Sequence, residues 1–270
     1  MRGLAVAAVL AAGLAVAALA NAESHPSGHY VGHTTCGAGS PVCPKQRAWA
    51  LLKVHPHEIS EFLADVTCRR GSNDTRTYVD ETLHHVKIDS QGNFNGATPP
   101  DPFSEQLRIH GHVAGGVVTG KIEYTDNGAF NDTPDEPSCD AHHIGFTAKF
   151  RKKPLFKPGN YSGVTHCSSP ASNHCTAQSN TISFTATKYA IKQGKTVMNC
   201  VDDNGKPYTY NAAFKLPIRW NGVFVFTSLS QPDANLSLGG RIKGTHAKGQ
   251  LLYDGDGVGC VVGFQADLVP

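Results

Sequence analysis

Apolar and polar residues alternate along most of the chain, and one alternating stretch occurs twice. Between residues 107 and 124, apolar residues or glycines occupy every second position of two short segments, with polar residues between them. The same pattern returns between residues 236 and 253, displaced by 129 residues. A period of two is typical of a strand that buries one face, and two such strands around a short turn form a β-hairpin. The pattern predicts an antiparallel unit present in two copies.

The duplication extends over nearly the whole chain. Glycines and a tyrosine open each copy at residues 28–32 and 159–163, and a strand with alternating apolar residues closes each copy. Each copy contains about eight short strands, and consecutive strands usually pair. The expected fold is all-β, with two tandem homologous antiparallel meander domains, each a small barrel or a sandwich. The expected domains are residues 23–150 and 159–270, and the basic, proline-containing segment 151–158 is the expected linker.

Residues 1–22 have the features of a secretory signal peptide. A basic start precedes an apolar, alanine-rich run at residues 4–19, and Ala20-Asn21-Ala22 fits a small-x-small cleavage site. We therefore expect a secreted, extracellular protein. The rest of the chain contains no apolar run of membrane-spanning length, so no transmembrane segment is expected after signal removal.

The charge balance argues against nucleic acid as a partner. Without the signal segment the chain carries 23 basic and 22 acidic residues. Nucleic-acid binding proteins usually have a strongly basic stripe, and near-neutrality does not favour one. The sequence leaves the partner itself unknown.

Eight cysteines in an exported chain favour disulfides. They comprise Cys36, Cys43, Cys68 and Cys139 in the first copy and Cys167, Cys175, Cys200 and Cys260 in the second. Four per copy favours pairing within each copy, in which three connectivities remain open. The preferred one has local pairs, Cys36–Cys43 and Cys167–Cys175, and longer pairs, Cys68–Cys139 and Cys200–Cys260. Structural zinc is the alternative, but no pair has the short C-x₂₋₄-C spacing.

These motifs resemble a group of exported, duplicated β-repeat proteins from high-GC bacteria, of actinobacterial type. The similarity rests on G-x-Y-x-G at the start, a cysteine in the third strand, the G-x₈-G-x₃-Y hairpin and a late cysteine before G-F-x-A. It covers both copies. The group has no assigned activity, so the resemblance implies fold and location and no catalytic residue.

Histidines are the unusual element, since eleven of fourteen precede Arg151. His110 and His112 are two residues apart on an expected strand, so both imidazoles point the same way and form a candidate zinc or copper site. The alternative is that both are solvent-facing. His84 and His142 share the phase of core residues, so we expect them to face inward, either as hydrogen-bonded core residues or as further ligands.

Acidic residues crowd the loop at residues 126–140, where oxygen ligands could hold calcium. The loop lacks the twelve-residue calcium pattern, so a solvated loop is the alternative.

Recognised catalytic motifs are missing from the sequence. The preferred interpretation is a secreted, non-catalytic β module that acts as a surface, matrix or binding protein. One alternative is an extracellular metal- or small-ligand-binding protein that uses the histidines of the first copy. A hydrolase with an unrecognised site is another.

Overall fold

The structure, a computed structural model, describes residues 25–36, 48–64, 66–70, 74–78, 82–99, 106–126, 139–168, 174–202, 204–227, 234–255 and 258–270. Side chains are not described at residues 36, 66–70, 74–78, 125–126, 139–143, 226–227, 234–235 and 258. Cys43, most of the 126–140 loop and the expected signal segment lie outside the described residues.

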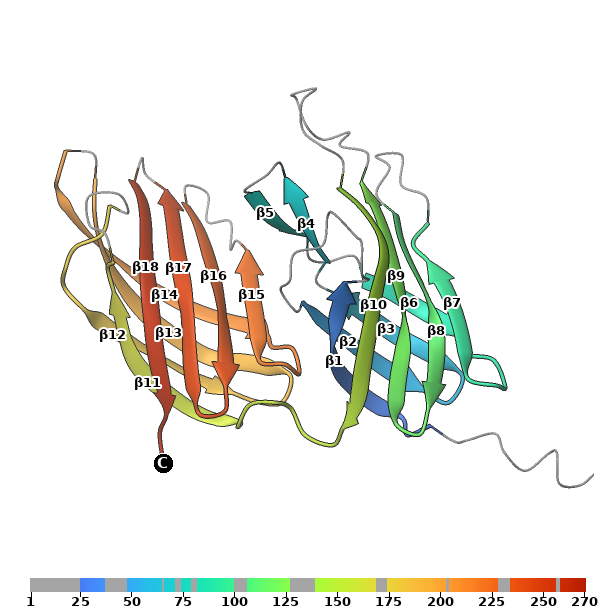
Figure 1. The fold of residues 1–270 in the computed structure, drawn as a ribbon. Helices are drawn as coiled ribbons and strands as arrows, with labels where there is room; N and C mark the ends of the chain where they lie inside the picture. Colours follow the sequence, from blue (N-terminus) through green and yellow to red (C-terminus); the bar gives the residue numbers. More distant parts are fainter. Residues whose placement is uncertain are drawn as a thin grey trace, which may run out of the picture. The chain divides into compact units, whose positions relative to one another are not determined.

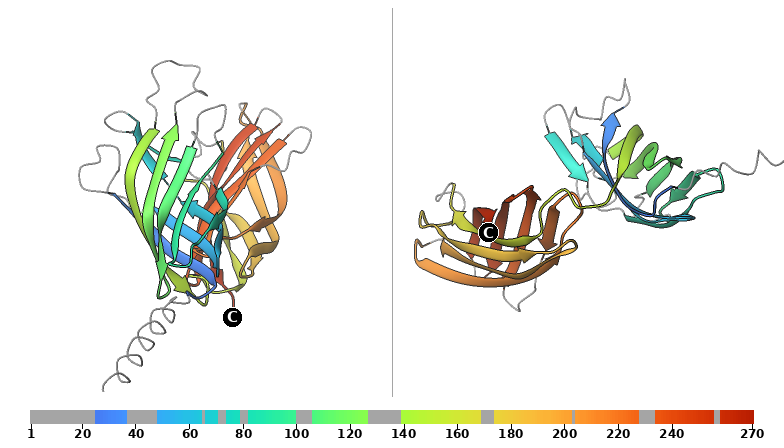
Figure 2. Two further views of the ribbon diagram at one scale, coloured as in Figure 1. Left: turned by 90° about the vertical axis from the view of Figure 1, so that its right-hand side faces the viewer. Right: turned by 90° about the horizontal axis from the view of Figure 1, so that it is seen from below.

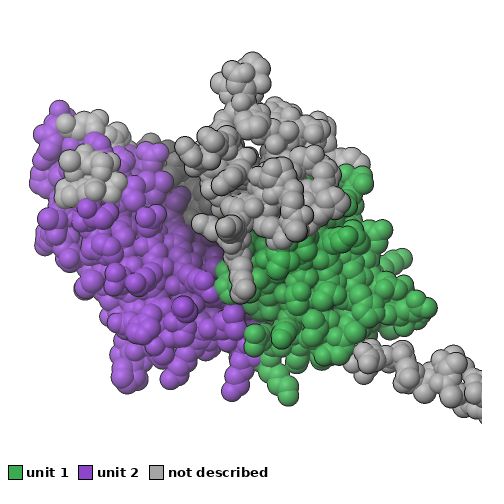
Figure 3. Space-filling model, in the orientation of Figure 1, with its two compact units in different colours: residues 1–152 green, residues 153–270 purple. Residues whose placement is uncertain are grey.

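The chain divides into two compact units, residues 1–152 and 153–270 (Figure 3). The strands of the first are β1 Gly28–Cys36, β2 Trp49–His55, β3 Glu58–Ala64, β4 Val66–Arg70, β5 Asp74–Tyr78, β6 Thr82–Lys87, β7 Asn93–Ala97, β8 Gln106–Ala114, β9 Val117–Asp126 and β10 Cys139–Arg151. Those of the second are β11 Gly159–His166, β12 Asn180–Ala186, β13 Ala190–Val201, β14 Pro207–Pro217, β15 Val223–Thr227, β16 Ala234–Lys243, β17 His246–Gly255 and β18 Val258–Leu268.

Each unit is an antiparallel meander that curves into a nearly closed barrel (Figures 1 and 2). The strand orders are β6-β3-β2-β1-β10-β9-β8-β7 and β14-β13-β12-β11-β18-β17-β16-β15, so the first strand of each unit pairs with its last. β4 and β5 form a separate hairpin in the first unit. The seam of the first barrel, between β6 and β7, carries an antiparallel bridge from Ile88 to Phe94. These observations confirm the all-β, tandem-meander prediction and favour barrels over sandwiches.

Alternation along the strands builds two separate cores. Tyr30, Phe62 and Phe146 are buried in the first unit, and Tyr161, Phe224 and Phe264 are buried in the second. Burying a large side chain of this kind stabilises a fold by about 1.5–3 kcal/mol. The period of two in the sequence is therefore the pattern of inward-facing residues on two barrel walls.

The glycines of the G-x-Y-x-G motif allow the first and last strands to approach closely. A Cβ at Gly32 would lie 1.8 Å from the Thr147 carbonyl oxygen, and one at Gly163 would lie 1.9 Å from the Gln265 carbonyl oxygen. Only a hydrogen atom fits at either position. The motif thus has a structural role where the first strand of each unit pairs with the last strand.

The inward prediction for His84 is wrong. His84 is exposed, and Leu83 faces the core opposite Phe62. Two outward residues, His84 and His85, separate Leu83 from the next inward residue, Val86, and His85 has a φ of 57°. In the second unit a single residue separates Phe214 from Leu216, both of which are buried. The first copy therefore has one extra residue here, which shifts the alternation.

The core space that Phe214 fills in the second copy is filled in the first copy by a side chain of the neighbouring strand. Phe62 is fully buried on β3, and Gly194 lies at the corresponding place on β13. A Cβ at Gly194 would come within 2.2 Å of the Phe214 ring. One copy thus supplies the aromatic ring from β3 and the other from β14, which leaves His84 with no place in the core.

Two disulfides in the second copy join the cysteine pairs of the preferred connectivity. Cys167 is bonded to Cys175, and Cys200 is bonded to Cys260. The second bond ties β13 to β18 across the barrel, with both sulfur-bearing residues fully buried. Of the first-copy cysteines, Cys36, Cys68 and Cys139 lie on strands whose side chains at those positions are not described, so their pairing stays a prediction.

Candidate functional site

The interiors of both barrels are filled by apolar side chains. Among the described residues, the buried polar side chains are Thr34, Thr98, Thr165, Thr196 and Asn221. No acidic, basic or histidine residue of the described part of the chain is buried. This agrees with eight-stranded barrels whose interiors are just wide enough for side chains. Among the described residues, the charged and histidine side chains are therefore outside the fully buried cores.

The outer face of β15–β18 is hollowed in the second unit. Alternation points Leu238, Leu251 and Phe264 into the core, so the residues between them face outward. Three adjoining hollows cover this face, which we call the β15–β18 face. One of the hollows shares Gln250 with the second hollow and Lys248 with the third. The face is thus one continuous surface.

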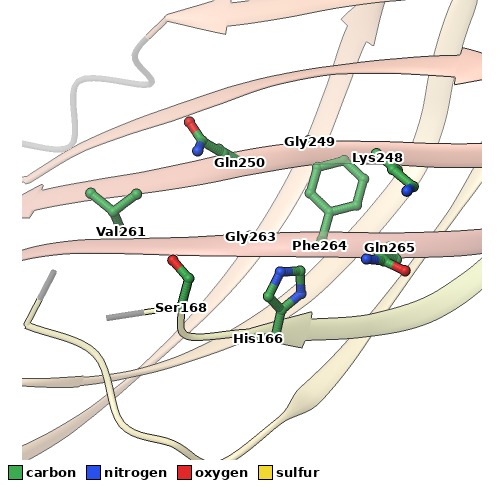
Figure 4. A pocket seen from close by; sticks show the side chains of 9 residues that line it. All are labelled: His166, Ser168, Lys248, Gly249, Gln250, Val261, Gly263, Phe264 and Gln265. Carbon is green, nitrogen blue, oxygen red and sulfur yellow. The ribbon is translucent and has the colours of Figure 1, made fainter. Parts of the chain in front are cut away.

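The central, polar hollow has a volume of about 270 Å³ (Figure 4). Its lining residues are His166, Ser168, Lys248, Gly249, Gln250, Val261, Gly263, Phe264 and Gln265. His166 lies directly opposite Gly263 across the β11–β18 pair. A Cβ at Gly263 would lie 2.7 Å from Nε2 of His166, so the imidazole packs over the glycine and fills the place of the missing side chain. The local sequence thereby sets a ring against the wall of the hollow.

The apolar hollow, of about 590 Å³, lies toward the β15 side of the face. Its lining residues are Val225, Ser237, Leu238, Gly239, Gly249, Gln250, Leu252 and Val261. Val225 is 53 % exposed and Leu252 is 41 % exposed. A Cβ at Gly239 would meet no atom within 4 Å, so the surface is open where this glycine lies.

The third, cationic hollow has a volume of about 610 Å³. Its lining residues are Arg241, Lys243, His246, Ala247, Lys248, Gln265 and Asp267. His246 Nδ1 lies 2.5 Å from Asp267 Oδ1, and both side chains are well exposed. Lys248 and Gln265 are directly opposite each other on β17 and β18, which joins this hollow to the polar one.

The histidines of the first copy lie on the outer face of β8. His110 and His112 are both exposed and share one face, as two residues at i and i+2 on a strand do. His112 Nε2 is 2.8 Å from the backbone oxygen of Gln91. Both side chains thus lie on the solvent-exposed face of β8, and their role as metal ligands stays a prediction.

The structure does not bring His84, His110 and His112 together as one ligand group. No group of three or more His, Cys, Asp or Glu side chains that could hold a metal occurs among the residues described. His84 therefore does not join His110 and His112. His142 lies on β10, but its side chain is not described, and a register shift between Ala141 and Ile144 interrupts the alternation on which its inward assignment was based. Zinc, copper or calcium binding stays a prediction.

Another histidine has a perturbed environment. His29 is partly buried on β1, directly opposite Lys53 of β2 and Arg151 of β10. Burial lowers the pKa of His29 to about 4, with smaller contributions from the charges of Lys53 and His55. The imidazole is therefore neutral near neutral pH, in a position where a charged ring would meet cations.

No family model and no curated protein matches this chain. A solved structure from Bacteroides fragilis, named a "putative outer membrane protein", aligns over 90 % of this chain and 97 % of its own, at 11 % identity and a TM-score of 0.23. Such a low TM-score is too small to indicate a shared fold. No helix in the described part of the chain has the length and hydrophobicity to cross a membrane.

The motif search missed the β15–β18 face because no motif marks it. Its features are a glycine on the polar phase, Gly239, and cations on that phase at Arg241 and Lys248. A weaker signal was present in the charge distribution. Residues 153–270 carry eleven Lys and Arg against six Asp and Glu, whereas residues 1–152 carry thirteen against sixteen. The near-neutral total hides two halves of opposite charge.

Proposed function

We propose that the protein is an exported, non-catalytic binding module whose ligand contacts the β15–β18 face. The observation that carries this proposal is the run of three adjoining hollows on one outer face, beside a barrel interior in which the described residues form an apolar core. Binding sites are concave and combine apolar walls with a few polar groups. Val225, Leu252, Gln250, His166 and Lys248 supply that combination here.

Export is supported by the cystines and by the amino-terminal sequence. Cys167–Cys175 and Cys200–Cys260 bonds persist in oxidising compartments and are rare in the reducing cytosol. The run at residues 4–22 has the pattern that secretion machinery cleaves. We expect the protein in the medium or on the cell envelope, with residue 23 at its new amino terminus. Amino-terminal sequencing of the exported protein tests this directly.

The ligand face is tested with a substitution that fills it. Gly239→Trp adds an indole where nothing lies within 4 Å, and Gly239 does not have a positive φ, so the backbone accepts a side chain. Gly259→Trp is the matched control, because Gly259 also has open space around its Cβ but lines none of the three hollows. Both variants and the parent protein are applied to an array of oligosaccharides and peptides.

The expected result is a set of ligands that the parent and Gly259→Trp retain and Gly239→Trp loses. Ligands retained equally by all three proteins would place binding elsewhere. Turnover of chromogenic esters or glycosides by the pure protein would contradict the non-catalytic assignment and favour the hydrolase.

A second candidate is metal binding by the first copy. The observation that favours it is the shared exposure of His110 and His112 on one face of β8. Calorimetric titration of untagged protein with zinc or copper, compared with His110→Ala/His112→Ala, tests it. Heat that the double variant lacks would support this candidate, and identical titrations would remove it.

A further inference from the structure

We propose that the open edge of β15 binds an extended peptide segment of a partner protein, which adds to the sheet as a further strand. The proposal goes beyond the proposed function, because it concerns the backbone at a sheet edge and not the three hollows. Three observations support it: unpaired backbone groups on β15, a proline on the other edge strand, and an edge sequence without charge.

The second sheet ends at β15 on one side and at β14 on the other (Figure 1). In the first unit, the bridge from Ile88 to Phe94 joins the two ends of the sheet. The corresponding residues of the second unit, Ile218 and Phe224, form no bridge. An edge strand presents a row of unpaired N–H and C=O groups, which is a template for another chain. The second unit therefore has an open edge where the first has a bridge.

The hydrogen bonds show which residues of β15 face this open side. The oxygen of Val223 accepts a hydrogen bond from the N–H of Arg219, which lies on the side away from β16. Successive residues of an antiparallel strand point their backbone groups to alternate sides. The N–H and C=O groups of Val225 and Thr227 therefore also point away from β16. Their geometry is complementary to the backbone of an extended peptide.

The other edge strand cannot supply all the missing partners. Ile218 donates its N–H to the oxygen of Tyr189, on the β13 side, so the nitrogen of the preceding residue, Pro217, faces the open side. A continued hairpin would place Pro217 opposite Val225. A proline nitrogen has no hydrogen to donate, whereas the corresponding residue of the first unit, Lys87, has an N–H. The Val225 oxygen is thus left for a donor from another chain.

The side chains of β15 do not protect the edge. Val223 and Val225 lie on its outer face, and Val225 is 53 % exposed. The first unit has Asn93 and Asn95 at the corresponding positions. Edge strands in natural proteins are commonly protected by charges, prolines or bulges, and β15 contains no charged residue and no proline. Apolar side chains of an added strand would pack beside Val223 and Val225, as cross-strand neighbours do.

The small size of the edge favours a peptide segment over a second copy of this chain. β15 has five residues, so two copies paired edge to edge would meet over a strand of roughly 17 Å. Stable complexes between folded proteins bury about 1,200–2,000 Å². Recognition by strand addition does not need such an area, because main-chain hydrogen bonds supply the affinity and alternate side chains supply the specificity.

The experiment selects peptides of about ten residues from a phage-displayed library on the mature, full-length protein. The selected peptides should alternate apolar and polar residues, and their synthetic forms should bind in fluorescence titrations. An alternately N-methylated copy keeps the side chains but loses the N–H groups of one edge, so it should bind about tenfold more weakly or worse. The amide of Val225 should exchange hydrogen rapidly in the free protein and slowly in the complex.

Substitutions at Val225 separate the edge from the apolar surface. Val225→Pro removes an N–H that β16 does not use and should lower the peptide affinity about tenfold. Val225→Asn installs the residue that β7 carries at Asn95 and should weaken binding through the lost apolar contact. Leu252→Asn is the matched control, because Leu252 is 41 % exposed but lies on β17, which is paired on both sides. This control should bind as the parent protein does.

Several outcomes would overturn the inference. They are a library without binders, full binding by both Val225 variants, an equal loss with Leu252→Asn, and unchanged exchange of the Val225 amide in the complex. Self-association in sedimentation that Val225→Pro abolishes would indicate a second copy in place of a partner protein. The proposed function is judged separately, because array ligands that Gly239→Trp loses and Val225→Pro retains would sustain it.

Discussion

The hydroxyl of Tyr161 donates a hydrogen bond to the backbone oxygen of Lys157, four residues earlier, over 2.6 Å. The first copy repeats the contact, with Tyr30 donating to the oxygen of Pro26 over 2.7 Å. Both rings are fully buried and both hydroxyls reach the chain that enters the barrel. The tyrosine of the G-x-Y-x-G motif therefore fixes the entry of each unit.

Tyr161→Phe should destabilise the second unit by about 1 kcal/mol or slightly more. The substitution keeps the ring in the core but leaves the Lys157 oxygen without its donor, and a lost hydrogen bond of this kind costs about 0.5–1.5 kcal/mol. Urea unfolding measures the change. Tyr189→Phe is the control, because Tyr189 is 62 % exposed. Equal effects of the two substitutions would contradict the assigned role.

Alkaline pH should destabilise both units through the same tyrosines. Burial raises the pKa of Tyr30 and of Tyr161 to about 12, above the value of 10.0 for an exposed phenol. The folded state thus holds each proton more tightly than the unfolded state. The contribution is complete below pH 10.0 and is lost as the pH rises toward about 12. Unfolding midpoints measured across this window should fall less steeply for Tyr30→Phe/Tyr161→Phe than for the parent protein.

Phe62 is buried in the core, where His84 had been expected, so shortening these two side chains should affect the stability very differently. Phe62→Ala should cost about 3–5 kcal/mol, because it opens a cavity at a fully buried position. His84→Ala should change the stability by less than about 0.5 kcal/mol, since the side chain is exposed. Chemical unfolding of both variants checks the prediction. A large loss for His84→Ala would show that the imidazole has a structural role after all.

The two disulfides should differ in their effects on stability. Cys200 and Cys260 are 60 residues apart, whereas Cys167 and Cys175 are 8 apart. In the chain-entropy model these loops correspond to about 4 and about 2.5 kcal/mol. Cys200→Ala/Cys260→Ala should therefore lower the free energy of unfolding more than Cys167→Ala/Cys175→Ala does. Urea titration of the two double variants, without reductant, measures the difference, and the reverse order would contradict the loop-length argument.

The repeated hairpin shows what the sequence alone could predict. Leu107 and Leu236 begin the same alternation, and a period of two with one buried face leaves little choice of structure. His84 shows where the prediction failed, because one extra residue reverses the phase, and the compensating Phe62 lies on another strand. The hollows were harder to predict from the sequence. They form where glycines, Gly239 and Gly263, have no side chain, and where residues such as Arg241 and Lys248 become neighbours through the strand register.

Acid should weaken the first unit through His29. Its pKa is lowered from 6.5 to about 4, first by burial and then by Lys53 and His55, so the unfolded state binds a proton more readily than the folded state. The stability is complete above pH 6.5 and declines as the pH falls toward about 4. His29→Gln removes the titrating group and should flatten the decline, whereas His110→Gln, on the exposed outer face of β8, should not. Thermal midpoints between neutral pH and the lower end of this window measure both. Parallel curves for His29→Gln and the parent protein would show that other groups govern the acid response.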